Sequence, residues 1–195
     1  MRNGLSSKYR AKIIRYADDF VVLCKGDVHQ PLALVKKVLK RLDLSLNATK
    51  TRIVDSHNES FVFLGFAFQM KRGFKSGKLY PHTEPAKKSM EKIKAEVRTL
   101  TRRENSTIPI EDIISMLNKK LVGWSGYFHY RNSTSSFTKL KTFVENRVAS
   151  HLGSRHKVRQ FRDSLKEFGY KRLYNEFGLF KIPLNASWKN VHALK

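Results

Sequence analysis

Two adjacent carboxylates, Asp18 and Asp19, are the residues of this chain whose types and spacing best suit chemistry. They stand between two apolar, β-prone runs, Ile13–Ile14 and Phe20–Leu23. This context predicts a hairpin over residues 12–25, with the acids on its tight turn. Mg²⁺ prefers carboxylate ligands together with substrate phosphates, and two such ions can activate a 3′-hydroxyl and stabilise a leaving pyrophosphate. The alternative is a solvated Asp-Asp turn without chemistry.

Hydrophobic periodicity predicts the elements that follow this turn. Apolar residues at three- and four-residue steps indicate an amphipathic helix from Pro31 to Leu42. Residues 50–72 are expected to form a second hairpin, with its turn at Ser56–Glu59 and an aromatic-rich returning strand from Phe61 to Phe68. Gly65 within that strand suggests a bulge or a close backbone approach.

The pattern changes from β to α within residues 73–85, where we place a domain boundary. Helices are predicted from Thr83–Pro85 to about Leu100, from Asn105–Pro109 to about Phe128, from about Phe137 to Val148, and from Val158 to Phe168, followed by a less regular tail.

Several motifs in series resemble one protein family. Arg15–Val22 resembles the catalytic hairpin of reverse transcriptases, especially those encoded by group II introns. Leu44–Ile53 resembles the next block of that family, and Phe63–Phe66 resembles its primer grip. The core of the group II maturase-specific domain is similar to Leu117–Asn118, Gly123–Trp124 and Tyr127–Phe128. Order and spacing agree over nearly the whole chain.

The resemblance implies an α+β fold with two domains. Residues 1–72 would be the C-terminal part of a reverse transcriptase palm, a small antiparallel remnant made of the first hairpin, a helix and the primer-grip hairpin. Residues 73–195 would be a helical thumb and maturase-specific domain. The family often ends in a zinc-bearing endonuclease domain rich in cysteine pairs, and with the single Cys24 we expect no such DNA-nicking domain here.

The resemblance also assigns roles to individual residues. Asp18 and Asp19 match catalytic metal ligands, and the residues matched to nucleotide or primer contact are Tyr16, Lys50, Phe63, Leu64 and Gly65. For Lys50 the alternative is a solvated lysine after a helix. For the primer-grip strand the alternative is packing against the thumb, and both can hold because alternate side chains face opposite sides.

A complete active site in this family needs a third carboxylate from an earlier strand. No Asp or Glu precedes Asp18 in this chain, and the nucleotide-binding fingers and first palm blocks are expected to be missing. We therefore expect no polymerisation by this chain alone. Mg²⁺ is expected only where missing palm residues, on a separate N-terminal fragment, complete the site.

The formal net charge of +23 favours a polyanionic partner, because each neutralised phosphate releases counterions. The predicted partner is RNA, a group II intron, with an RNA/DNA hybrid as a further possibility. The predicted RNA-binding residues are Lys87, Lys88, Lys92, Arg98, Arg102, Arg103, Arg155, Lys157 and Arg159. Trp124, Tyr127 and Phe128 either stack on bases or belong to the core, and their helical spacing favours the core.

Other features set limits on the function. No apolar run of about 18 residues exists, so no membrane role is expected. A single cysteine permits no internal disulfide and no cysteine-based zinc site, which favours a cytoplasmic, nucleic-acid-associated protein. His129, His151 and His156 lack the spacing of paired metal ligands.

Three hypotheses follow. The first is a truncated group II intron reverse transcriptase/maturase that keeps RNA binding and assistance to splicing. The second is the C-terminal half of a split reverse transcriptase, an RNA-directed DNA polymerase. The third is an inert retroelement remnant.

Overall fold

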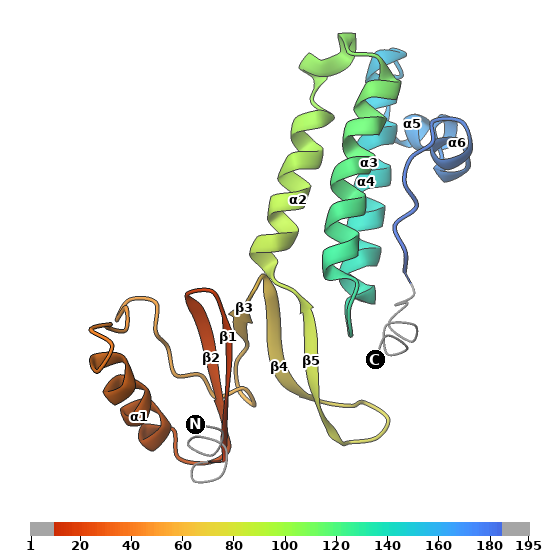
Figure 1. Ribbon diagram of the computed structural model, residues 1–195. Coiled ribbons are helices and arrows are strands. Elements are labelled where there is room, and N and C mark those ends of the chain that lie inside the picture. Colours follow the sequence, from red (N-terminus) through yellow and green to blue (C-terminus); the bar gives the residue numbers. More distant parts are fainter. Residues whose placement is uncertain (1–9, 185–195) are drawn as a thin grey trace, which may run out of the picture. The chain divides into compact units, whose positions relative to one another are not determined.

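The computed structural model describes residues 10–184. The fold is α+β, as predicted, with two small antiparallel sheets and six α-helices among these residues (Figure 1). Contacts divide the chain into two compact units, residues 1–55 and 56–195. The predicted boundary between residues 72 and 73 stays a prediction for the family domains. By contacts, however, the second hairpin belongs with the helices.

The first unit contains the predicted acid-bearing hairpin and helix. Strand β1 (Ala11–Tyr16) pairs antiparallel with β2 (Asp19–Cys24), with Ala11 opposite Cys24 and Tyr16 opposite Asp19. Helix α1 (His29–Lys40) follows, close to the range predicted from its apolar spacing. The two-residue connection confirms the tight turn.

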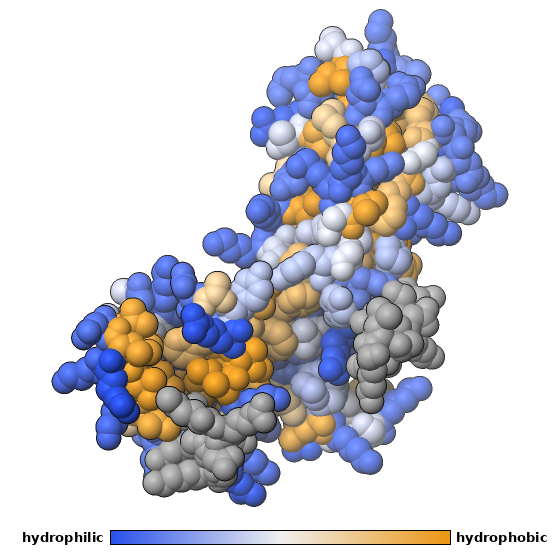
Figure 2. All heavy atoms as spheres, viewed as in Figure 1, coloured by the Kyte–Doolittle hydropathy of each residue, from blue (hydrophilic) through white to orange (hydrophobic). Residues whose placement is uncertain are grey.

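The first unit buries few side chains. Among its described residues only Ala11, Pro31 and Val35 are buried. Ile13 and Ile14 are 45% and 41% exposed, and as neighbours on one strand they point to opposite faces. Figure 2 shows hydrophobic residues at the surface of this unit. A two-stranded hairpin is at best marginally stable by itself, so packing against both of its faces would stabilise it.

The second unit begins with a three-stranded antiparallel sheet in the order β3-β4-β5. Its strands are β3 (Phe61–Phe63), β4 (Phe66–Arg72) and β5 (Leu79–Pro85). A turn lies at residues 56–59, as predicted, but no strand precedes it, and the single strand predicted from Phe61 to Phe68 was wrong. The hairpin turn lies at Leu64–Gly65, where both residues have positive φ, +50° and +78°. This is the backbone that a two-residue hairpin loop requires.

Strand β5 was not predicted, because Pro81 and Pro85 were interpreted as residues that interrupt regular secondary structure. Proline is tolerated on an edge strand, and within the described sheet β5 pairs only with β4. On the side of β5 that faces away from β4, two hydrogen bonds join Thr83 to Asn132, which lies in a loop between helices. Asn132 N–H donates to the Thr83 carbonyl at 3.1 Å, and Thr83 N–H donates to Asn132 Oδ1 at 3.3 Å.

Three long helices form the core of the second unit, as their periodicity predicted. They are α2 (Lys87–Leu100), α3 (Ile110–Phe128) and α4 (Thr134–Arg155), with a short 3₁₀ helix, η1 (Arg103–Thr107), between the first two. Their fully buried side chains include Val97, Ile113, Leu117, Leu121, Phe137, Leu140 and Val148. Phe128 is buried and Trp124 packs against Phe128 and Phe137, which confirms a core role for these two, whereas Tyr127 is half-exposed.

Two short helices and an extended segment complete the described chain. Helix α5 (Phe161–Glu167) lies within the predicted stretch, and α6 (Tyr170–Asn175) falls in the segment expected to be irregular. The segment after α6 is fixed by Asn118 of α3. The Asn118 amide donates to the Gly178 carbonyl at 2.8 Å and accepts from Phe180 N–H at 2.7 Å. Leu179 and Ile182 are buried in the helical core as a result.

The Leu64–Gly65 turn is clamped to the helices by three hydrogen bonds. The Gly65 carbonyl accepts from Ala86 N–H at 2.8 Å and from Ser89 Oγ at 2.9 Å. The Tyr127 hydroxyl donates to the Leu64 carbonyl at 3.0 Å. The next residue, Phe66, stacks against Phe128, with ring centroids 4.9 Å apart. The turn therefore joins the start of α2 to the end of α3.

Gly65→Ala should destabilise this unit. An added Cβ would lie 3.1 Å from Ser89 Oγ and 3.2 Å from the Phe128 ring, at a φ that disfavours side chains. We expect a loss of about 2–3 kcal/mol in unfolding free energy, from backbone strain plus crowding. Gly77→Ala is the matched control, because its φ is +62° and nothing lies within 4 Å of the added atom. It should lose only about 1 kcal/mol. Equal losses in denaturant titrations would show that the clamp is not tightly packed.

Candidate nucleic-acid interface

The Asp18–Asp19 pair sits on a rigid two-residue turn. Ala17 has a φ of +50°, and Arg15 Nε donates to the Ala17 carbonyl at 2.8 Å, which fixes the turn from one side. Asp18 lies in the turn and Asp19 begins β2, and both are exposed. Two carboxylates held side by side in water are suitable ligands for a hard cation.

The donor set for Mg²⁺ is incomplete within the described residues. Across residues 10–184, no three His, Cys, Asp or Glu side chains lie close enough to hold a metal ion. Mg²⁺ gives up its waters reluctantly and binds where carboxylates and phosphates converge. The role of Asp18 and Asp19 as metal ligands stays a prediction, and a complete donor set would need ligands beyond these two.

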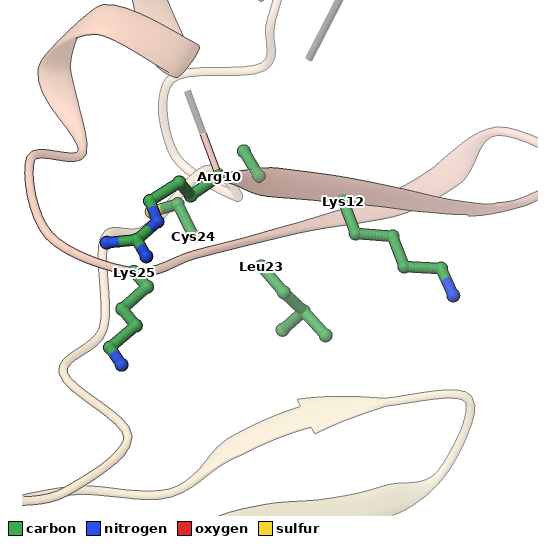
Figure 3. A pocket seen from close by; sticks show the side chains of 6 residues that line it. Arg10, Lys12, Leu23, Cys24 and Lys25 are labelled. Carbon is green, nitrogen blue, oxygen red and sulfur yellow. The ribbon is translucent and has the colours of Figure 1, made fainter. Parts of the chain in front are cut away.

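A shallow basic hollow lies at the other end of the same hairpin. It has a volume of about 510 Å³, and Figure 3 shows Arg10, Lys12 and Lys25 around it. The hairpin register places it at the Ala11–Cys24 pair. Five residues of strand separate that pair from the acidic turn, or roughly 16 Å at about 3.3 Å per residue. The hollow is therefore distinct from the candidate metal ligands.

The residues matched to nucleotide or primer contact fall in both units. Tyr16 ends β1 with its side chain 63% exposed. Lys50 is exposed on a turn organised by Asn47, whose Oδ1 accepts from the N–H groups of Thr49 and Lys50 at 3.0 and 3.2 Å. No contact among the described residues joins Lys50 to the aspartates.

Phe63, Leu64 and Gly65 belong to the second unit and take part in its clamp. The Leu64 and Gly65 carbonyls are occupied by bonds to the helices, which supports the packing alternative for this motif. Phe63 and Leu64 keep partly exposed side chains. Their role in primer contact stays a prediction.

The outer face of α2 carries a row of unpaired cations. Lys88 and Lys92, four residues apart, lie on one face of the helix and are exposed, as is Lys87. These three form no ion pair with any described residue. Arg98 is different, because it contacts Glu91 at 3.7 Å and lies over the Phe143 ring at 5.1 Å. Figure 2 shows hydrophilic residues over much of the visible helical surface.

A second hollow brings together basic residues far apart in the sequence. Its volume is about 700 Å³, and its lining includes Arg103 of η1 and Arg155, His156 and Lys157 at the end of α4. Leu152, Ile110 and Phe177 contribute apolar surface, and Glu111 adds one acid. The two basic segments predicted from the sequence thus meet at one place.

The basic residues around this hollow differ in whether other groups of the fold engage them. The Arg155 guanidinium donates a hydrogen bond to the Ile108 carbonyl, so part of its hydrogen-bonding capacity is used within the fold. Arg102, Arg103, Lys157 and Arg159 are exposed, and no ion pair engages them within the described chain. Arg159 does not line the hollow.

Sequence reasoning missed one group of basic residues, on and beside the loop between β4 and β5. Lys75 and Lys78 lie on the loop and fell within the segment 73–85 that was interpreted as a domain boundary, whereas Lys71 and Arg72 end β4 and fell within the predicted hairpin 50–72. The sequence did contain a signal for them, because four basic residues lie close to Phe74 and no Asp or Glu occurs between residues 60 and 83.

Comparison with known families agrees with this organisation. The model of the reverse transcriptase family, described as an RNA-dependent DNA polymerase, matches residues 1–68. The model of the group II intron maturase-specific domain matches residues 90–169. The chain therefore carries a segment similar to reverse transcriptases followed by one similar to the group II intron maturase-specific domain, in the order that the sequence motifs predicted.

One curated relative is described as an uncharacterized 91 kDa protein in a cob intron of Schizosaccharomyces pombe. It is 22% identical over 222 residues, covering 99% of this chain and 27% of the relative. The chain thus spans about a quarter of the length of that relative. Within the described residues, no helix has the length and apolar character needed to cross a membrane.

His151 adds a pH-dependent element one turn before Arg155. Its side chain is buried, and burial lowers its pKa, with the positive charge of Arg155 as the next cause. The folded state therefore favours neutral His151. Its contribution to stability is present above the ordinary histidine pKa, near 6.5, and is lost as the pH falls below that value.

We expect the melting temperature to fall between pH 7.5 and pH 5.5. In His151→Gln, which stays neutral, this fall should be smaller. His29→Gln is the control, because His29 is exposed on α1 and should leave the pH dependence unchanged. Identical profiles for wild type and His151→Gln, measured by thermal denaturation, would contradict the assignment.

Proposed function

We propose that this chain binds structured RNA through the basic surface of its helical unit and thereby supports the folding and splicing of an intron RNA. The observation that carries this proposal is the arrangement of unpaired cations on α2 and around the 700 Å³ hollow. Similarity to the maturase-specific domain supports the same assignment.

The proposal is favoured by charge and by rigidity. The +23 formal charge makes counterion release a large favourable term for any phosphate ligand. The cations stand on helices whose inner faces are fully packed, so little order has to be gained on binding. Double-stranded RNA is recognised mainly by shape and phosphate contacts, which such a surface can provide.

The α2 contacts can be tested by charge reversal. Lys88→Glu with Lys92→Glu should weaken binding of a structured intron RNA and reduce the slope of log affinity against log salt by roughly 1.8, at about 0.9 per phosphate contact. Lys166→Glu with Lys171→Glu makes the same charge change at exposed positions on α5 and α6.

Filter binding across a salt series measures the RNA affinity and its salt slope, and melting curves show whether each variant is folded. The control pair should change the slope much less than the α2 pair. Equal slopes for the two variants would show a diffuse charge effect in place of a site on α2. Absence of RNA retention by the wild type at low salt would overturn the proposal and leave the inert-remnant hypothesis.

A second candidate function is completion of a polymerase with a palm-and-fingers fragment supplied by another chain or a longer form of this one. It is favoured by the hairpin of the first unit, which exposes Ile13 and Ile14 on opposite faces. In that assembly Asp18 and Asp19 would hold Mg²⁺ with an added carboxylate, and Tyr16 and Lys50 would face the nucleotide. The ion would supply activation of the 3′-hydroxyl.

This candidate predicts a conditional activity. The 195-residue chain should give no primer extension on an RNA template with Mg²⁺, because two acids on a turn bind the ion weakly. Addition of a palm-and-fingers fragment should restore extension, and Asp18→Ala should then abolish it. Asp27→Ala, at an exposed acid after β2, is the control and should retain activity. Extension by the chain alone, lost in Asp18→Ala, would mean that this chain supplies the missing ligand.

A further inference from the structure

The loop between β4 and β5 carries a phenylalanine that nothing covers. Phe74 is 104% exposed, more than any other large hydrophobic residue of the described chain. A large apolar side chain gains free energy by leaving water, so the exposed ring of Phe74 is available to stabilise a bound ligand.

The loop holds a fixed shape. Gly73 N–H donates to the Lys78 carbonyl at 2.9 Å, and Gly77 N–H donates to the Gly73 carbonyl at 2.8 Å. Arg72 contributes a bond from its guanidinium to the Gly77 carbonyl at 3.2 Å. These bonds close the loop on itself, so Phe74 is displayed outward from a preformed turn.

The charge around Phe74 is positive. Lys75 and Lys78 are exposed and take part in no ion pair with the described residues. Lys71, near the end of β4, contacts Glu84 at 3.9 Å. The segment from residue 60 to residue 83 contains no acid. An aromatic ring framed by cations fits a nucleotide, whose base stacks while its phosphates pair with the lysines.

We propose that the β4–β5 loop is a second RNA contact, which takes an unpaired nucleotide by stacking its base on Phe74. This rests on the proposed RNA-binding function and adds single-strand recognition to it. The loop lies at the far end of β4 from the α2 clamp (Figure 1). The seven residues of β4, at about 3.3 Å each, separate the loop from the clamp at the start of α2 by roughly 23 Å. One folded RNA can therefore engage both, which raises affinity without further contacts.

The test compares single-stranded and duplex RNA on the full chain. Phe74→Ala should weaken binding of a short single-stranded RNA about tenfold and leave binding of a blunt RNA duplex unchanged. Phe74→Trp should bind as well as wild type, whereas Phe74→Leu, apolar but without a π face, should behave like Phe74→Ala. Because Phe74 makes no packing contact, every variant should keep the wild-type melting temperature.

Two further measurements separate stacking from charge. A 2-aminopurine in the single strand should be quenched by wild type and by Phe74→Trp, and not by Phe74→Ala. Lys75→Ala with Lys78→Ala should reduce the salt slope for single strands by roughly 1.4. Phe161→Ala on α5 is the control for loss of an exposed aromatic ring and should leave single-strand affinity unchanged.

The outcomes distinguish this inference from the proposed function. If the α2 charge reversal weakens duplex binding but Phe74→Ala leaves single-strand affinity intact, the loop contact is wrong and the proposed function stands. Full retention of single-strand affinity by Phe74→Leu would also overturn stacking, because leucine has no π face. If wild type binds neither RNA at low salt, the proposed function itself fails.

Discussion

The second unit depends on the attachment of one β-turn to the ends of two helices. The Leu64–Gly65 turn offers two backbone carbonyls, and α2 and α3 satisfy both through Ala86, Ser89 and Tyr127. The Gly65 carbonyl is part-buried, where loss of its partners would carry a desolvation cost, so its two bonds hold the start of α2 against the sheet, and the more exposed bond from Tyr127 adds the end of α3. The α2 cations follow directly from the clamp, because Lys87 and Lys88 come immediately after Ala86.

This clamp also gives a structural reason for a motif that resembles a primer grip. Gly65 is the residue at its closest approach, where any side chain would meet Ser89 and the Phe128 ring. The requirement for glycine thus arises from the fold itself, before any primer is considered. Phe63 and Leu64, with partly exposed side chains, are where contact with nucleic acid remains compatible with the packing.

The sequence was most informative where one periodicity ran without interruption. Residues 86–100 and 110–128 bury the positions that their three- and four-residue spacing predicted, because a helix can place only one stripe against a core. The strands were harder. A two-residue turn at Leu64–Gly65 interrupts an aromatic run that otherwise reads as one strand, and the prolines of β5 are compatible with pairing only because β5 is an edge.

The candidate site also has a part that the sequence predicted and a part that it did not. The turn with Asp18 and Asp19 was predictable because the two acids are adjacent and the strands that flank them are neighbours in the sequence. The hollow lined by Arg103 and Lys157 was not, because η1 and the end of α4 meet only after the helices pack. Nor does sequence distinguish a cation engaged by the fold from a free one. Arg155 and Arg98 look like their basic neighbours, yet one bonds the Ile108 carbonyl and the other lies over Phe143.

Positive charge greatly exceeds negative charge in this chain, and only part of it is paired within the fold. Five glutamates of the described chain form ion pairs, as with Glu96 and Lys120 at 2.9 Å or Glu145 and Lys141 at 2.9 Å. A partly exposed pair such as Glu96 with Lys120 contributes little to stability, typically about 0–1 kcal/mol. The remaining cations repel one another, which destabilises the free protein. A polyanion relieves that repulsion most strongly in the folded state, where the helices hold the cations together. The same excess charge that burdens the unbound chain therefore stabilises it once RNA is bound.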